Sequence, residues 1–510
     1  MTRTTQRGAK QEPRFLALAA TTTLPATTTA ATSMPSLVEK KDSSGTALLS
    51  HPQDDEDGVK ARRRRTTQIR NDAAFWLLGL INNSGYVIMM AVAKEIAPDA
   101  VGIVFLADVA PTMIIKVTAP YWFHLVPYSV RVWACTVLLT LSLVTVGCGG
   151  STTVQLLGVC LSSLQGGLGE ASFLALASFY DTPRALTAWS SGTGFAGIFG
   201  YAWVWALKFV LGLSFRATLM MANLLGLFLL FAYFRLLSSP VSAHGSNSRR
   251  QARGENGDVS PAVASSQRLQ PSPPSPSLEG GGRRGRGLFP SNSAQGGGEE
   301  DDGWGLREGR GGRALDVEVV AVESHHPPEM TVGERLRFTL SLWRFIVPLM
   351  LVYFAEYTMQ TGTWSAIGFP VSSVTARQRF YQYANWCYQG GVFVSRSSGM
   401  VIRLSPRMLW SLPTVQMAML LFFYLVAVEQ FWYDYSLLFL CFGVGLVGGL
   451  GYVNAFRLVA EAVHPELKEL ALTAASVGDS FGVMFSDIFG TFVQACVYKT
   501  NGIPGAWATC

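Results

Sequence analysis

The stretch Gly-Gly-Leu-Gly at 166–169, followed by Ala-Leu-Thr-Ala at 185–188, decides the fold, because both pieces return later in the chain. The second copies stand at 448–451 and 471–474, so the offsets are 448 − 166 = 282 and 471 − 185 = 286. Two pieces therefore recur in the same order at nearly the same spacing, and all four copies lie in apolar runs. An in-order repeat of apolar helices predicts two like-built halves related by an axis along the membrane normal.

The composition is typical of a polytopic membrane protein rather than a soluble domain. Of the 510 residues, 49% are hydrophobic and only 15% are charged, and the mean hydropathy is +0.27. The formal net charge of +6 comes from basic clusters outside the apolar runs, notably at 62–65 and 283–286. Such clusters orient helices in a bilayer, so we expect the lipid bilayer as a partner and no nucleic acid. The seven cysteines show no spacing typical of a metal site.

Eleven apolar stretches are long enough to cross roughly 30 Å of hydrocarbon, which takes about 20 residues each. Six precede a polar central segment, at 73–93, 99–119, 131–149, 153–180, 185–208 and 216–237. Five follow it, at 341–362, 382–402, 408–428, 433–457 and 470–497. The repeat makes the Gly-Gly-Leu-Gly stretches the fourth and tenth spans, so the missing span is the twelfth. We therefore predict an all-α, major-facilitator-like membrane protein with two pseudo-symmetric halves of 6+5 helices.

The remaining segments divide the chain around these spans. We expect a disordered cytosolic tail at 1–70, a six-helix half at 71–237, a disordered cytosolic linker at 238–338, a five-helix half at 339–497 and a short tail at 498–510. Basic residues concentrate on the side of the N-terminal tail and the linker, which the positive-inside rule makes cytosolic. An odd number of spans then places the C-terminal tail in a lumen or outside.

Several charged residues lie inside the apolar spans. A charged side chain at a helix centre costs about 2.5–3.5 kcal/mol on insertion scales, so each one usually faces a cavity or a partner. Glu170 and Glu356 lie mid-span and could face a cavity or make a buried structural hydrogen bond. Asp108 and Lys116 share the second span, where Lys116 could instead reach the cytosolic interface. The last span carries Asp479 and Asp487, and Asp487 is the weaker candidate.

The repeat pairs some of these residues across the halves. Glu170 corresponds to Tyr452, and Thr193 corresponds to Asp479. Because equivalent positions in a two-half transporter often face the same central cavity, these four residues are linked candidates for binding solute or protons. Arg396, towards the cytosolic end of the eighth span, is a possible partner for an anion. Further polar candidates, for which a hydrogen bond between helices is as good an explanation, are Asn82, Asn83 and Asn454.

The chain carries two glycine patterns that resemble a dinucleotide-binding fingerprint, Gly-x-Gly-x-x-Gly at 192–197 and at 443–448. That fingerprint requires a preceding strand, and neither pattern has one, so we interpret both as close helix packing. The sequence also lacks a Ser/His/Asp set, a Walker motif and a paired intramembrane Asp motif. We therefore predict neither an enzyme nor a cofactor or metal.

Short motifs along the spans add a resemblance to a known family. They are Phe75–Leu80 with Asn82 and Asn83, Leu106–Asp108, Gly167–Glu170, Ser190–Gly194, Val352–Tyr357, Ser395–Ser398 and Tyr452–Asn454. In this order, over about residues 71 to 490, they resemble the battenin family. The resemblance implies a major-facilitator-like protein of lysosomes or vacuoles, with roles in organelle pH, basic amino acids and the export of glycerophosphodiesters. The family's C-terminal prenylation box is missing, because Cys510 is the last residue.

Together these observations predict a secondary transporter of an acidic organelle that moves a small polar or zwitterionic solute by alternating access. Glu170, Glu356 and Asp479 are its expected protonatable groups, and protons are a possible second cargo. The alternative is a membrane scaffold or regulator of organelle pH and trafficking that keeps the transporter fold but moves nothing.

Overall fold

The computed structural model describes residues 52–96, 101–238, 330–504 and 509–510. Within these residues the regular structure is helical, and no strand is present. The described residues from 61 onward form one compact unit. Most of the N-terminal tail and of the linker expected from the sequence lies outside the described residues.

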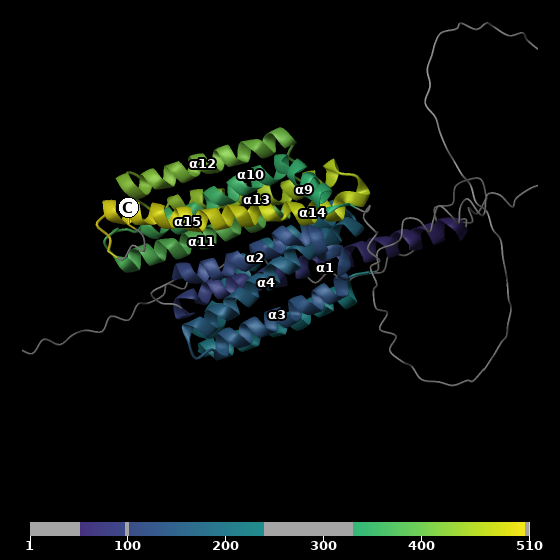
Figure 1. Ribbon diagram of the computed structural model, residues 1–510, viewed down its shortest axis with the longest axis horizontal. Coiled ribbons are helices and arrows are strands. Elements are labelled where there is room, and N and C mark those ends of the chain that lie inside the picture. Colours follow the sequence, from purple (N-terminus) through teal and green to yellow (C-terminus); the bar gives the residue numbers. More distant parts are fainter. Residues whose placement is uncertain (1–51, 97–100, 239–329, 505–508) are drawn as a thin grey trace, which may run out of the picture. The chain divides into compact units, whose positions relative to one another are not determined.

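Figure 1 shows the helices of the two halves as two groups that run along a common direction. The first half comprises α1 (Pro52–Ile96), α2 (Val101–Trp122), α3 (Tyr128–Cys148), α4 (Thr152–Leu176), α5 (Thr182–Trp205), α6 (Phe215–Ala222) and α7 (Leu224–Phe231). The second half comprises α9 (Val332–Ser341), α10 (Trp343–Thr358), α11 (Val374–Ser397), α12 (Pro406–Glu429), α13 (Leu437–Ala462), α14 (Lys468–Ala475) and α15 (Val477–Thr500). Three π-helical turns extend α5, α7 and α10, at Ala206–Val210, Ala232–Leu236 and Met359–Thr363.

Local capping explains where several of these helices begin. The side chains of Ser151, Ser373 and Ser405 each accept a hydrogen bond from a backbone N–H of the first turn of α4, α11 and α12. Such caps satisfy donors that have no partner inside the helix. At α11 the cap starts the helix at Val374, eight residues before the expected 382, because the apolar run begins later than the helix does.

Two expected disordered segments are helical in part, which corrects the sequence-based boundaries. Helix α1 begins at Pro52, within the tail expected at 1–70, and α9 lies mostly within the linker expected at 238–338. At α9, Thr331 and Glu334 form a reciprocal capping box, in which each side chain accepts from the other residue's backbone N–H. A capping box predicts a helix start from sequence alone. It was missed here because the surrounding charged residues were interpreted as part of the polar linker.

The described residues contain eleven helical rods, six between 52 and 236 and five between 332 and 500, when α6 with α7, α9 with α10, and α14 with α15 are each taken as one. Six of the helices are long and apolar enough to cross a membrane, or seven if α9 and α10, bent by 63° at their junction, count as one. Helices α2, α4, α5 and α11 fall short of that criterion. Each of them packs against a helix of the other half and carries Gly, Ser or charged residues along its length.

The packing between the halves has the symmetry that the repeat predicts. The second span, α2, packs against the fifth span of the other half, formed by α14 and α15. Equivalently, α5, the fifth span of the first half, packs against α11, the second span of the second half. Each half therefore presents its second and fifth spans to the other, and the predicted all-α plan of two pseudo-symmetric halves is confirmed.

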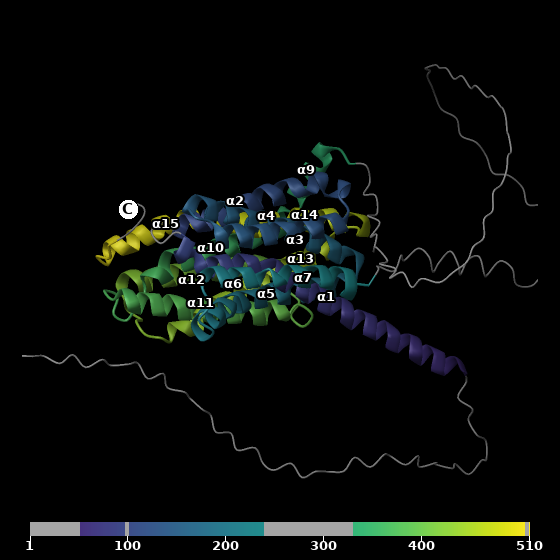
Figure 2. The ribbon, with the colours of Figure 1, turned by 90° about the horizontal axis from the view of Figure 1, so that it is seen from below.

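The bundle has two ends, which are named here by the segments that leave them. The linker end is where α9 lies, and the C-terminal end is where the C-terminus lies, close to α15 (Figure 2). Tryptophan side chains are exposed near both. Trp133, Trp343 and Trp410 lie towards the linker end, and Trp205 and Trp432 lie towards the C-terminal end. Aromatic belts of this kind mark the two interfaces of a bilayer.

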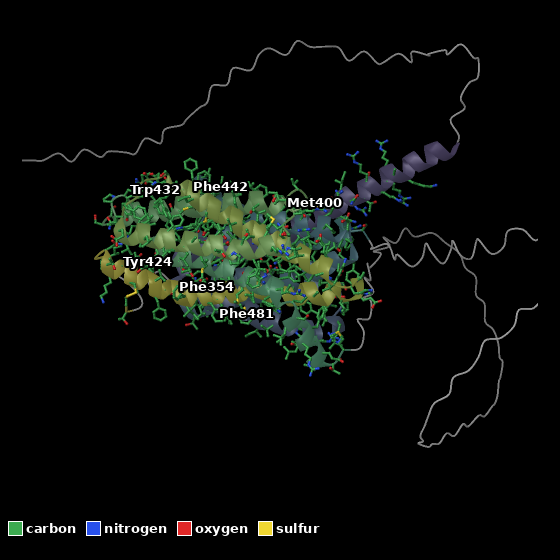
Figure 3. All side chains as sticks on the ribbon, turned by 90° about the horizontal axis from the view of Figure 1, so that it is seen from above. Phe354, Met400, Tyr424, Trp432, Phe442 and Phe481 are labelled. Atoms are coloured by element: carbon green, nitrogen blue, oxygen red, sulfur yellow. A yellow bond between two sulfur atoms is a disulfide. The ribbon has the colours of Figure 1, made fainter. Side chains whose placement is uncertain are left out.

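Between these belts the outer surface is apolar, with large hydrophobic side chains exposed on several helices, including Leu141, Leu227, Phe228, Leu421, Phe439 and Phe489. Figure 3 shows all described side chains on the ribbon, with Tyr424 and Trp432 near the C-terminal end and Met400 near the linker end. A soluble protein rarely exposes so continuous an apolar surface, whereas a membrane-spanning bundle requires one.

The glycine patterns at 192–197 and 443–448 lie inside α5 and α13, as the packing interpretation expects. A Cβ on Gly192 would stand 2.0 Å from the carbonyl oxygen of Trp76 in α1, and one on Gly445 would stand 2.1 Å from that of Tyr388 in α11. The missing side chains let these helices cross in backbone contact.

Candidate functional site

A cavity of about 120 Å³ lies between the halves near the middle of the bundle. Its charged lining residues are Asp108, Lys116, Glu170, Arg396 and Asp479. Two cations and three carboxylates give it a formal charge of 2 − 3 = −1, so the cavity can hold both anionic and cationic groups of a solute.

Lys116 of α2 connects the halves through a buried ion-pair triad. Its Nζ lies 2.6 Å from Oε2 of Glu170 in α4 and 3.1 Å from both carboxylate oxygens of Asp479 in α15. Only 1% of the Lys116 side chain is exposed, so it does not reach the interface as the alternative explanation required. Glu170 belongs to the same half as Lys116 and Asp479 belongs to the other.

Arg396 of α11 makes an equivalent set of contacts with uncharged groups. One guanidinium nitrogen donates to Oγ1 of Thr193 in α5 at 2.6 Å, and another donates to the hydroxyl of Tyr353 in α10 at 2.5 Å. The guanidinium carbon lies 4.0 Å from the centre of the Tyr452 ring, in cation–π contact. Its Nε is buried and has no hydrogen-bond partner in the described part of the chain.

The two sets are related by the repeat. Lys116 and Arg396 are 396 − 116 = 280 residues apart, close to the offsets that relate Glu170 to Tyr452 and Thr193 to Asp479. Each cation contacts the fourth span of its own half, at Glu170 or Tyr452, and the fifth span of the other half, at Asp479 or Thr193. The equivalent positions therefore place two carboxylates around Lys116 and no carboxylate around Arg396.

Tyr452 joins the two sets directly. Its hydroxyl donates to Oε1 of Glu170 at 2.7 Å and accepts from the indole N–H of Trp189 at 3.2 Å, while its ring lies beneath Arg396. The four linked candidates of the sequence, Glu170, Thr193, Tyr452 and Asp479, are therefore in one network with Lys116 and Arg396.

Glu356 of α10 lies apart from this network and does not line the cavity. Its carboxylate accepts a short hydrogen bond from the Tyr388 hydroxyl and a bond of 3.4 Å from the Gln416 amide. A Cβ on Gly448 would stand 1.9 Å from its Oε2, so the carboxylate lies directly against the α13 backbone. The structure brings Glu356 into contact with α11, α12 and α13 within the second half.

Asp108 of α2 also lines the cavity, but unlike Glu170 and Asp479 it forms no ion pair there with any residue that the structure describes. Its side chain is 4% exposed, and neither carboxylate oxygen has a hydrogen-bond partner among the described residues. It is the one carboxylate of the cavity lining for which no partner is found there.

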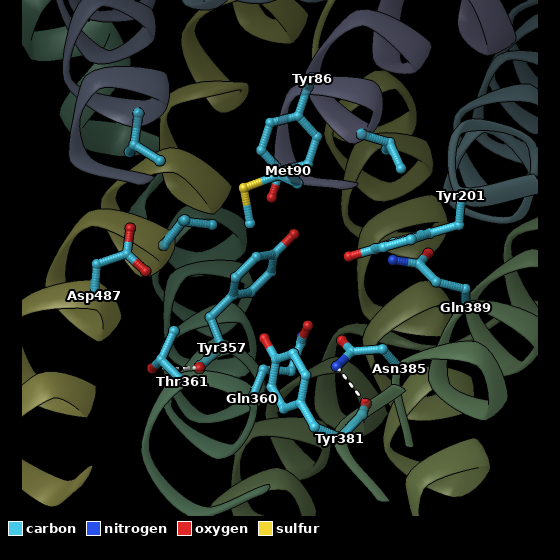
Figure 4. Close-up of a pocket in the computed structure, with 13 residues that line it drawn as sticks. Tyr86, Met90, Tyr201, Tyr357, Gln360, Thr361, Tyr381, Asn385, Gln389 and Asp487 are labelled. Atoms are coloured by element: carbon cyan, nitrogen blue, oxygen red, sulfur yellow. Dashed lines mark hydrogen bonds between the residues drawn. The ribbon is translucent and has the colours of Figure 1, made fainter. Parts of the chain in front are cut away.

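A second, smaller chamber of about 40 Å³ adjoins the cavity towards the C-terminal end. Figure 4 shows Tyr86 and Tyr357 pointing towards one another in this chamber, with Thr361 below Tyr357 and Asp487 on the left side of the chamber. Tyr86 and Tyr357 line both chambers, as do Val109 and Val483. The two tyrosines therefore form the partition between the chambers.

At the linker end the halves are held together by polar contacts. The Tyr128 hydroxyl donates to Glu469 at 2.6 Å, and a guanidinium nitrogen of Arg335 donates to the carbonyl oxygen of Pro120 at 2.8 Å. The hydroxyls of Ser191 and Ser397 are 2.9 Å apart. The cavity therefore lies behind a closed linker end, with the second chamber on its other side.

The asparagine candidates separate into two groups. Asn82 and Asn83 line the cavity, where the Asn82 amide donates to the Gly166 carbonyl oxygen at 3.2 Å and accepts from Gln165 at 2.9 Å. Asn454 lies outside the cavity lining and accepts from the backbone N–H of Leu404 at 2.9 Å. Asn454 therefore anchors the loop that precedes α12.

Sequence reasoning missed several residues of this site. It did not pair Lys116 with Arg396, although their offset of 280 residues carries that signal. It also did not identify Trp189, Tyr353 and Tyr357, because aromatic residues in apolar helices have no distinguishing pattern.

Comparison with known proteins gives the family. The family model described as "CLN3 protein" matches residues 73–499. Protein BTN1 of Chaetomium globosum is 34% identical over 442 residues, covering 82% of this chain and 86% of that protein. Battenin of Canis lupus familiaris is 31% identical over 457 residues, covering 82% and 89%. Protein BTN1 of Saccharomyces cerevisiae is 28% identical, covering 82% and 92%.

Among solved structures, the E. coli fucose:proton symporter covers 85% of this chain and 97% of its own, at 12% identity and a TM-score of 0.44. The human organic anion transporter MFSD10 covers 86% and 97%, at 13% identity and a TM-score of 0.46.

The two pseudo-symmetric halves, the apolar outer surface and the charged cavity between them define a multi-pass membrane protein of the transporter type. The match over most of the chain identifies it further: the chain belongs to the CLN3, or battenin, family.

Proposed function

We propose that the protein is a secondary transporter of a lysosomal or vacuolar membrane, and that Arg396 binds an anionic group of its solute in the central cavity. The observation that carries the proposal is the pairing of Arg396. Among the residues that the structure describes, this buried cation contacts two hydroxyls and one aromatic ring, and its Nε has no hydrogen-bond partner.

Burying a guanidinium without a carboxylate partner costs free energy unless a bound anion neutralises its charge. Guanidinium groups bind carboxylates and phosphates through parallel hydrogen bonds, which suits an amino acid or a phosphodiester equally. On the opposite side of the cavity, Glu170 and Asp479 together carry one more negative charge than Lys116 neutralises. A zwitterionic or basic solute would therefore be held between the two poles.

This arrangement supports glycerophosphodiesters or basic amino acids, the solute classes that the family resemblance implies, with a contribution to organelle pH homeostasis. Transport would proceed by alternating access, with the halves rocking about the contacts of α2 with α15 and of α5 with α11. The closed contacts at the linker end, Tyr128 with Glu469 and Ser191 with Ser397, would open when the cavity faces that side.

We also propose that the linker end faces the cytosol and the C-terminal end faces the lumen. Basic residues support this orientation, since Arg184, Arg403 and Arg407 lie at the linker end. At the other end, Cys496 and Cys510 form a disulfide. Disulfides persist in oxidising compartments and are rare in the cytosol.

The test is transport by the purified full chain in liposomes, with radiolabelled glycerophosphocholine and radiolabelled lysine as probes. Arg396→Gln should raise the apparent KM of the transported probe about 10- to 100-fold, because hydrogen bonds to charged groups contribute about 1.5–3 kcal/mol. Arg379→Gln is the matched control, since Arg379 lies on the same helix but is exposed outside the cavity. Absence of uptake of either probe by the wild-type chain would count against the proposal.

The alternative is a scaffold or regulator that keeps this fold without moving solute. Arg396→Gln separates the two classes. In a transporter it should reduce flux while folding and trafficking stay normal. In a scaffold, which has no flux to lose, it should instead reduce partner binding or stability.

A further inference from the structure

We propose that Asp108 and Asp487 form the proton-coupling site of this transporter, distinct from the Lys116 triad and from Glu356. The inference rests on the proposed transport function and assigns a role that the solute site does not supply. The buried carboxylates differ in whether each has an ion-pair or hydrogen-bond partner.

The carboxylates expected to be protonatable from sequence are already satisfied. Glu170 and Asp479 share the charge of Lys116 at 2.6 and 3.1 Å, and Glu356 accepts hydrogen bonds from Tyr388 and Gln416. Protonating Asp479 would break the ion pair that joins the two halves, and protonating Glu170 would break the ion pair of Lys116 within the first half. These residues are therefore poorly suited to bind and release a proton in every cycle.

Asp108 has the opposite properties. It is 96% buried, both of its oxygens lack a partner among the described residues, and it faces the cavity. An isolated buried carboxylate is costly as an anion and much less costly as a neutral acid or beside a bound cation. Asp108 should therefore bind a proton when the cavity is closed and release it when water enters.

Asp487 provides the route to that site. It is partly exposed and lines the second chamber, towards the C-terminal end, whereas Asp108 lines the central cavity. The two chambers share Tyr86, Val109, Tyr357 and Val483 in their linings, so the two carboxylates lie on either side of one partition. A proton that crosses this partition leaves one carboxylate and binds the other, as a relay requires.

The groups that surround Asp108 fit this role. Tyr86 on α1 and Tyr357 on α10 form the partition between the chambers, and their hydroxyls can pass a proton across it. The charged groups of the same cavity are Lys116 on α2, Glu170 on α4, Arg396 on α11 and Asp479 on α15.

A proton fits the pair better than a metal cation does. No group of three His, Cys, Asp or Glu side chains that could hold a metal ion occurs among the described residues. A proton requires only one carboxylate at a time. In each cycle one carboxylate gains one proton and later loses it, so no other reactant is needed.

The test compares two measurements on the same liposomes, using whichever probe, glycerophosphocholine or lysine, the wild-type chain exchanges. The first is solute exchange at equal pH on both sides, and the second is accumulation driven by a pH difference of one unit. One coupled proton gives about tenfold accumulation for that difference. Asp108→Asn should lower the ratio of driven accumulation to exchange about tenfold, to the value without coupling. Asp487→Asn should slow the driven phase.

Asp434→Asn is the control, because Asp434 is an exposed loop residue at the same end. Gel filtration and thermal unfolding establish that each variant is folded, and Asp108→Glu keeps the carboxylate if Asp108→Asn is unstable. An unchanged ratio in Asp108→Asn overturns the inference while leaving the transport function intact. A sodium gradient that drives accumulation in place of the pH gradient also overturns it. Failure of the wild-type chain to exchange either probe overturns the proposed function itself.

Discussion

The hydroxyl of Tyr452 donates a 2.7 Å hydrogen bond to Glu170, and these two residues occupy equivalent positions in the two halves, 282 residues apart. Residues related by the repeat therefore meet across its axis. One of them is a carboxylate that pairs with Lys116, and the other is a phenol that lies beneath Arg396. The asymmetry of charge in a symmetric frame creates one acidic and one basic pole in the same cavity.

The two roles of Tyr452 can be separated by substitution. Tyr452→Phe removes the hydrogen bond to Glu170 and should lower the free energy of unfolding by about 1.5–3 kcal/mol, the usual contribution of a hydrogen bond to a charged group. Tyr452→Leu also removes the ring beneath Arg396, so it should cost about 2 kcal/mol more. Thermal unfolding of the purified protein measures both. On a Glu170→Gln background the effect of Tyr452→Phe should shrink, and an undiminished effect would show that the bond to Glu170 is not its cause.

For the Lys116 triad, replacing all three charged residues should destabilise the protein less than replacing Lys116 alone. Lys116→Met leaves Glu170 and Asp479 as two buried carboxylates without a cation, which should destabilise the protein by about 3–5 kcal/mol. Adding Glu170→Gln and Asp479→Asn removes the unpaired charges and should restore most of the stability, since buried ion triads contribute little net free energy. Thermal unfolding of the single and triple variants measures this. A triple variant that is less stable than Lys116→Met would contradict the ion-pair account.

Much of this fold was predictable from sequence because its determinants are local. The apolar runs specify the rods, and the repeat of Gly-Gly-Leu-Gly specifies which rods are equivalent. The repeat also identified Glu170, Thr193, Tyr452 and Asp479 as members of one site. The pairing of the charges was not predictable, because Lys116 and Asp479 lie 363 residues apart and their contact depends on how the two halves pack.

Other features escaped prediction for physical reasons that differ from case to case. Helices α9 and the start of α1 are polar, so an apolar-run criterion cannot detect them. Glu356 has the same sequence signature as Glu170, a lone carboxylate in an apolar span, yet the structure directs it towards Tyr388 within its own half. Sequence alone cannot distinguish a buried carboxylate that faces a cavity from one that faces a neighbouring helix.

Gly448 and its counterpart Gly166 provide a matched pair. A Cβ at Gly448 would stand 1.9 Å from Oε2 of Glu356, whereas a Cβ at Gly166 would meet nothing within 4 Å. Gly448→Ala should displace the Glu356 carboxylate and cost about 1–3 kcal/mol. Gly166→Ala should be neutral or stabilise its helix by up to about 1 kcal/mol. The difference between the two melting temperatures is the measurement, and equal values would mean that Glu356 moves aside freely.

His124 makes the contact of α9 with α2 sensitive to pH. Burial and the positive charges of Arg335 and Arg131 lower the pKa of His124 below its ordinary value. Its Nδ1 lies 3.3 Å from a guanidinium nitrogen of Arg335. Because the folded state binds the proton less readily than the unfolded state, the contribution of His124 to stability is complete above about pH 6.5 and is lost as the pH falls through the lowered value.

The corresponding experiment compares melting temperatures at pH 7.5 and pH 5.5. His124→Gln should reduce the loss of stability on acidification, because it removes the group that gains the unfavourable charge. His464→Gln is the control, since His464 is exposed at the same end and lies beside Glu466 rather than an arginine. Equal losses in the wild-type chain and in His124→Gln would contradict the assignment.

The disulfide between Cys496 and Cys510 is a direct test of the proposed orientation. The other five cysteines are free, at positions 135, 148, 160, 387 and 441. The protein made in cells and denatured without a reductant should therefore take up 7 − 2 = 5 maleimide–polyethylene glycol tags, and seven after reduction. Cys510→Ser should take up six tags without reduction, because it frees Cys496, and should lose up to about 3 kcal/mol of stability with the loop closure. Seven tags on the unreduced wild-type chain would place the C-terminal end in a reducing compartment and reverse the proposed orientation.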